Sequence, residues 1–237
     1  MSTQARSIRL LLWVCIAFTG IALARQSELP RQYQPMFGGL NPEDARRLLS
    51  DADRALLKFG PAADPAGVSA AWIRTGLKSY YTGDYNTAIR SFNLAWLAKP
   101  TNSTAVAALG VAAGARDGAC LGAPLVQNAT KSGPVDSTVA VDAVGTLANC
   151  VLQPENSKDE NAVPLYCSSI RSLLATLGGT SAQRSDSQFE IAIVSLTACT
   201  SYDDAWKQVA LMRRLLGREP RAELLDVLTK LAPEPPK

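Results

Sequence analysis

The chain has 237 residues, of which 47% are hydrophobic and 19% charged, and its formal net charge is +3. This composition is typical of a globular protein, and the near-neutral charge argues against a nucleic-acid-binding surface. Histidine is absent, which excludes Ser-His-Asp and Cys-His catalysis and metal sites that use imidazole. Because alanine and leucine recur at helical spacing and alternating strand patterns are lacking, the sequence predicts an all-α fold.

The first 24 residues have the parts of a secretory signal peptide. Arg6 and Arg9 precede an uncharged run from Leu10 to Ala24, which ends in the small-x-small cleavage pattern Ala22-Leu23-Ala24. The run has 15 residues, fewer than the roughly 20 that span a bilayer, and this favours cleavage over an uncleaved membrane anchor. We therefore expect an exported protein, periplasmic or secreted, that meets the membrane only if the signal stays uncleaved.

Two segments of different character follow the signal. Residues 25–40 hold two prolines and a Gly-Gly pair and have little periodicity, so we predict a flexible linker there. A helix is predicted over 42–59, because Asn41 is a good N-cap and Pro42 suits a first helical turn. Gly60 is expected to end this helix.

A helical hairpin is predicted next. Asp64 caps a helix that runs to about Thr82. Gly83 breaks this helix, and Asp84 caps a second one that stops before Pro100. The two helices are joined by a short turn, so they are expected to lie antiparallel.

The hairpin resembles a tetratricopeptide repeat, a unit of about 34 residues with large and small residues at fixed positions. Over 68–100 the matching residues are Trp72, Gly76, Gly83, Tyr85, Ala88, Phe92, Ala95 and Pro100. Ser79 departs from the pattern, which has Tyr at that position. The resemblance implies that Gly76 and Ala88 let the two helices approach closely, and that Trp72 and Phe92 fill the space between them.

A second copy of the first helix lies 34 residues further along the chain. At this spacing Val106 corresponds to Trp72, and Gly110 corresponds to Gly76. Further helices are expected over about 119–131, 136–150 and 163–179, then a hairpin over 189–217 and a last helix over 220–231. Polar loops are expected at 153–162 and 180–186. The prediction is an α-solenoid of about four degenerate helix pairs with a C-terminal capping helix, over residues 41–232, and a tail over 233–237.

The cysteines fit an exported repeat protein. Besides Cys15 in the signal, the chain has Cys120, Cys150, Cys167 and Cys199, an even number that implies two disulfides in an oxidising compartment. In such a stack neighbouring helices are antiparallel, so the start of one helix meets the end of the next. This implication of the resemblance favours Cys120–Cys150 and Cys167–Cys199, while a Cys150–Cys167 bridge within one hairpin is also allowed.

The resemblance also implies a binding surface. First helices of tetratricopeptide hairpins line a concave groove, and their positions typically hold peptide ligands in that family. On this chain those positions are Ile73, Arg74, Leu77, Lys78, Tyr80 and Tyr81. Two cations and two aromatic rings would suit an extended or acidic peptide. The alternative is that Leu77 and one tyrosine only pack against the preceding helix, with the basic residues in solvent.

The equivalent surface of the second copy is made of small residues, so the groove there is either shallow or filled by a neighbour. Its positions are Thr104, Ala107, Ala108, Val111 and Ala115. No motif indicates a catalytic residue, a cofactor or a metal, and we expect a protein that is not an enzyme.

We expect a scaffold or adaptor in the bacterial cell envelope that engages a protein or peptide partner. The alternative is an immunity protein or inhibitor that neutralises one exported effector. The sequence leaves the identity of the partner and the oligomeric state open.

Overall fold

The computed structural model describes residues 29–58, 64–153, 161–178 and 185–235. Over these residues the protein is all-α, with twelve α-helices, one 3-10 helix and no β-strand. The predicted signal peptide, 1–24, lies outside the described residues, as do most of the loops expected at 153–162 and 180–186. A search of the described helices finds none with the length and apolar character needed to cross a membrane.

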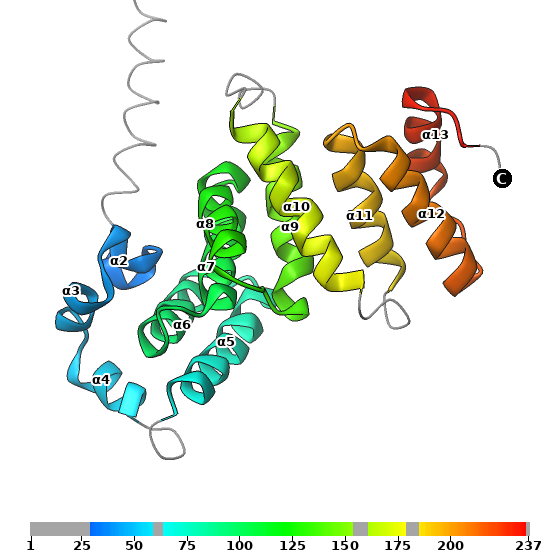
Figure 1. Cartoon of the computed structure of the whole chain (residues 1–237). Helices are drawn as coiled ribbons and strands as arrows, with labels where there is room; N and C mark the ends of the chain where they lie inside the picture. Colours follow the sequence, from blue (N-terminus) through cyan, green and yellow to red (C-terminus); the bar gives the residue numbers. More distant parts are fainter. Residues whose placement is uncertain (1–28, 59–63, 154–160, 179–184, 236–237) are drawn as a thin grey trace, which may run out of the picture.

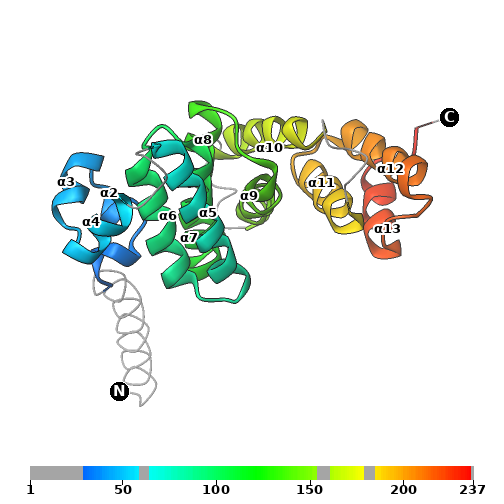
Figure 2. The same ribbon diagram turned by 90° about the horizontal axis from the view of Figure 1, so that it is seen from below.

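The helices follow one another along an elongated array (Figure 1 and Figure 2). α5 (Pro65–Tyr81) packs against α6 (Tyr85–Ala98), and α7 (Ser103–Asp117) packs against α8 (Ala119–Ser132). α6 also contacts α7, so the second helix of one pair packs against the first helix of the next pair.

The array continues in the same order towards the C-terminus. α9 (Ser137–Val151) packs against α10 (Ala162–Gly178), and α11 (Asp186–Ala198) packs against α12 (Tyr202–Leu216). α13 (Ala222–Leu231) contacts α11 at the C-terminal end. α9 contacts both α7 and α11, so the first helices of successive pairs are neighbours.

Side-chain caps explain where several helices begin. Asp64, Asp84, Asn102 and Asp136 each accept a hydrogen bond from a backbone N–H in the first turn of the helix that follows. Gly83 has a φ of +81°, a conformation that glycine adopts without strain, and it makes the turn between α5 and α6. The helix starts predicted from Asp64 and Asp84 are confirmed.

Glycines let the paired helices approach closely. A Cβ atom on Gly76 would lie 2.3 Å from Cε1 of Phe92, which is fully buried, so the predicted role of this glycine is confirmed. A Cβ atom on Gly122 of α8 would lie 2.0 Å from the carbonyl oxygen of Gly110 on α7. In the second pair, therefore, backbone packs on backbone.

The apolar core has a large and a small part. Buried side chains from α2 to α10 form one cluster, and Ile193, Trp206 and Leu228 belong to a smaller one shared by α11, α12 and α13. Leu174 on α10 packs against both clusters. The C-terminal helices therefore have a core of their own that meets the main core at α10.

Two disulfides reinforce the array. Cys120–Cys150 joins α8 to α9, and Cys167–Cys199 joins α10 to the residue that follows α11. This is the pairing favoured from the sequence, and the alternative bridge between Cys150 and Cys167 is not formed. Disulfides are typical of an oxidising, extracellular environment.

Residues 29–40 are folded, which corrects the flexible linker predicted over 25–40. η1 (Arg31–Tyr33) and α2 (Met36–Gly39) pack against α6, and the side chain of Phe37 is buried. The amide of Asn93 on α6 donates hydrogen bonds to two backbone carbonyls of this segment and accepts one from the N–H of Met36. One buried side chain of α6 thus orders a proline-rich and glycine-rich segment.

The single helix predicted over 42–59 is in fact two helices, α3 (Pro42–Arg47) and α4 (Asp51–Lys58). The hydroxyl of Ser50 accepts a hydrogen bond from the N–H of Asp53 at 3.1 Å, so Ser50 caps a new helix. The predicted end of the helix at Phe59 and Gly60 lies outside the described residues.

Candidate functional site

One cavity is bordered by the first helices of all four pairs. Its volume is about 220 Å³, and α5, α7, α9 and α11 contribute to its walls together with the first residue of α8. The lining residues are Tyr80, Val111, Gly114, Ala115, Ala119, Val141, Asp142, Gly145, Thr146, Asn149 and Ile191. We call this cavity the groove. It is smaller than the roughly 300–1,000 Å³ of typical small-molecule pockets, and its size suits a single side chain.

The groove lies where the predicted binding positions recur. Val111 follows Leu77 by 34 residues, and Gly145 follows Val111 by the same spacing. Asp142 follows Arg74 by two such repeats. The binding positions predicted from the sequence extend only to the second copy, so they include neither Asp142 nor Gly145. The same 34-residue spacing, applied once more to the third copy, identifies both residues.

Asp142 is the one carboxylate among the groove-lining residues, and these include no lysine or arginine. Its Oδ2 atom accepts a hydrogen bond of 2.8 Å from the hydroxyl of Tyr81, 61 residues earlier. Burial raises the pKa of Asp142, and the hydrogen bond from Tyr81 acts in the opposite direction. Within the described part of the chain, this half-buried carboxylate therefore has one hydrogen-bond partner, and that partner is neutral.

Two tyrosines of α5 stand beside this carboxylate. The ring centroids of Tyr80 and Tyr81 are 5.2 Å apart in an edge-to-face arrangement, and Tyr80 is also 5.8 Å from Tyr85. Burial, then the charge of Asp142, raises the pKa of Tyr80 to about 12, so its hydroxyl stays protonated at neutral pH. Tyr81 remains 65% exposed, so its ring is open to a ligand.

The other predicted residues divide between core and surface. Ile73 is only 7% exposed and belongs to the main core, which removes it from the binding surface. Leu77 packs partly against the same core. Arg74 and Lys78 are exposed, and their spacing places them with Tyr81 on one face of α5.

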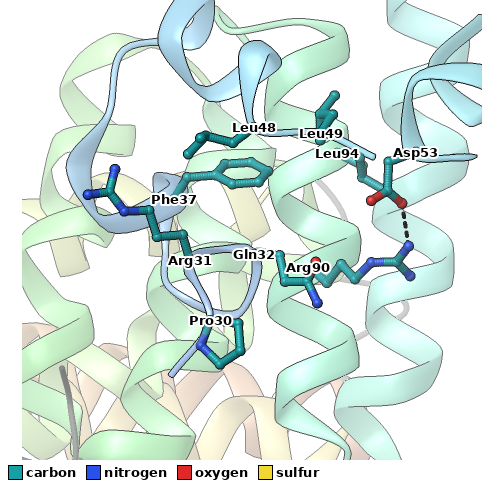
Figure 3. Close-up of a pocket in the computed structure, with 9 residues that line it drawn as sticks. All are labelled: Pro30, Arg31, Gln32, Phe37, Leu48, Leu49, Asp53, Arg90 and Leu94. Carbon is teal, nitrogen blue, oxygen red and sulfur yellow. Dashed lines mark hydrogen bonds and ion pairs between the residues drawn. The ribbon is translucent and has the colours of Figure 1, made fainter. Parts of the chain in front are cut away.

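A second cavity of about 220 Å³ lies between the N-terminal segment and α6 (Figure 3). Its lining includes Phe37, Asp53 and Arg90. The carboxylate of Asp53 accepts a hydrogen bond from the hydroxyl of Ser50 and forms an ion pair with Arg90. Since these charged groups satisfy each other, we interpret them as an anchor that holds α4 on α6.

A wider hollow of about 880 Å³ lies over α12, beside the C-terminal segment. The indole N–H of Trp206 donates a hydrogen bond of 3.1 Å to the carbonyl of Ala232. Arg213 forms ion pairs with Glu219 and Glu234. These contacts hold the C-terminal segment against α12, which accounts for Trp206, Arg213 and Glu234 beside the hollow.

The lining of the groove combines apolar side chains, one tyrosine and one carboxylate. Among the residues that the structure describes, no group of three or more Cys, Asp or Glu is placed to hold a metal ion. Comparison with protein-family models, curated proteins and solved structures finds no match for this chain. Its function is therefore inferred from the groove.

Proposed function

We propose that this chain is an exported repeat protein of the tetratricopeptide type, which binds a protein or peptide partner in the groove. The observation that carries the proposal is the convergence of α5, α7, α9 and α11 on one cavity. Stacked helical hairpins use such concave surfaces to hold extended segments of other proteins. Two disulfides and a signal-like N-terminus support a place for this scaffold or adaptor in the cell envelope.

The dimensions of the groove favour a peptide over a free metabolite. About 220 Å³ accommodates one side chain, while the surrounding rim is open. Tyr81, Ala115 and Asn149 are exposed at this rim and lie on three different helices. An extended chain could therefore lie across the helices and insert one residue, with Tyr81 as an aromatic contact.

Gly145 provides the sharpest test of the proposal. A Cβ atom at this position would meet no atom within 4 Å, so a larger side chain enters open space. Gly145→Leu is expected to fill the groove and leave the fold intact, while Gly145→Ala leaves most of the groove open.

The experiment is affinity capture from the exported fraction of the source cells, followed by mass spectrometry. The wild-type chain and Gly145→Ala should retain a partner that Gly145→Leu loses. Capture that is equal with all three proteins would contradict binding in the groove. A single stoichiometric partner would favour the alternative function, an inhibitor of one exported effector, and several envelope proteins would favour an adaptor.

A further inference from the structure

The charge of the groove differs from the charge expected for it. Arg74 and Lys78 suggested an acidic peptide, but neither residue lines the cavity. The charged residue that does line it is Asp142 on α9. Tyr80 and Tyr81 are the titratable groups next to this carboxylate, and both are neutral at physiological pH. The cavity itself is therefore negatively charged.

Burial removes water from the carboxylate of Asp142, and the hydrogen bond from Tyr81 replaces that water only in part. Without a cation nearby, the ionised carboxylate is therefore in an unfavourable environment. A ligand cation would replace the lost solvation with a charge-assisted hydrogen bond. A ligand could donate a hydrogen bond to Oδ1 of Asp142, since Tyr81 already donates to Oδ2.

The remaining lining defines the rest of the ligand. Val111, Val141 and Ile191 provide apolar surface, which suits the aliphatic stem of a long side chain. The ring of Tyr80 lines the same cavity, and tyrosine rings attract cations over their faces. Lysine and arginine have both features, an aliphatic stem for the apolar walls and a cationic tip for the carboxylate.

We propose that the groove receives a lysine or arginine side chain of the partner, with Asp142 as its counter-ion. This inference rests on the proposed function, because it names the residue that enters the groove. It reverses the acidic-peptide expectation drawn from α5 alone.

The test uses the oxidised full chain and a phage-displayed library of random 12-residue peptides. Selected peptides are expected to share one lysine or arginine position, and a synthetic peptide from the selection provides the probe. Asp142→Asn, which keeps the shape of the side chain, should weaken its binding about 10- to 100-fold, the range for a lost charged hydrogen bond. Replacing the shared basic residue by glutamine should weaken binding equally, and the two changes together should cost little more than either alone.

Three controls separate the outcomes. Asp226→Asn on α13 removes the same charge far from the groove and should leave binding unchanged. Peptides that lose binding to Gly145→Leu but bind Asp142→Asn as tightly as the wild type, or that share an acidic residue, would overturn the lysine or arginine inference alone. A selection without binders, or peptides that bind Gly145→Leu normally, would overturn the groove as a peptide site and the inference with it.

Discussion

Gly122 and Gly145 are both helical glycines, but they face different surroundings. A Cβ atom on Gly122 would lie 2.0 Å from a backbone oxygen of the facing helix, inside the α7–α8 pair. A Cβ atom on Gly145, in α9, would meet nothing within 4 Å and would point into the open groove. One glycine permits close packing, and the other leaves space.

The different surroundings of these two glycines indicate which small residues the fold requires. A glycine inside a helix is about 0.5–1 kcal/mol less stable than alanine, and at Gly122 the close approach of two helices offsets this loss. At Gly145 no packing contact offsets it. We therefore attribute Gly145 to the proposed binding surface, since stability is commonly given up for function.

Gly122→Ala should have the largest effect on stability. The added methyl group would collide with backbone atoms of Gly110 and Gly114, which cannot move without separating α7 from α8. We expect the free energy of unfolding to fall by about 3 kcal/mol or more, as for severe overpacking. Urea denaturation followed by circular dichroism measures this loss, and wild-type stability would show that the two helices are not in backbone contact.

Gly76→Ala should have the next largest effect. Here the collision is with the ring of Phe92, a side chain that can shift slightly although it is fully buried. A loss of about 1–3 kcal/mol is expected in the same denaturation experiment. The double variant Gly76→Ala with Phe92→Leu should recover part of this loss, because the smaller side chain leaves room for the methyl group.

Gly145→Ala should change stability in the opposite direction. With open space around the new methyl group, the gain in helix propensity is expected to raise the free energy of unfolding by about 0.5–1 kcal/mol. Thermal unfolding under oxidising conditions provides the measurement. A lower melting temperature would mean that the floor of the groove is packed rather than open.

Asp142→Asn should give the smallest change in stability, and the size of that change should depend on pH. Burial raises the pKa of Asp142 in the folded state above its usual value of 3.8, so the ionised carboxylate favours unfolding at neutral pH. Asparagine removes this cost and can still accept the hydrogen bond from Tyr81.

The melting temperature of Asp142→Asn should therefore exceed that of the wild type at pH 7. This advantage should shrink as the pH falls through the raised pKa of Asp142 towards 3.8, because the wild-type carboxyl then becomes neutral. A wild type that is more stable than the variant at pH 7 would show that the charge of Asp142 supports the fold.

Local patterns predicted much of the helical architecture. Asp64, Asp84 and Asn102 are caps that lie next to the helices they begin, so sequence alone could place those helices. The same holds for Gly76, whose role follows from its fixed distance to Phe92 within one hairpin.

Contacts between distant residues explain what the sequence did not reveal. Asn93 orders a segment that precedes it by about 60 residues, and nothing within that segment indicates the partner. Tyr81 and Asp142 also meet across 61 residues, from copies that share few side chains. Arg74 and Lys78 were the visible charges, but Asp142 became the charge of the groove because α9 lies beside α7.

The most direct test of the central claim, that a partner occupies the groove, is site-specific photo-crosslinking in the source cells. A benzophenone amino acid is placed at Tyr81, beside the groove, and in a separate protein at Leu121 on α8, which is not a groove-lining residue. The two positions are similarly exposed, at 65% and 54%, so accessibility does not separate them. We predict an adduct with a partner from position 81 and none from position 121. An adduct from position 121 alone would contradict the proposed site.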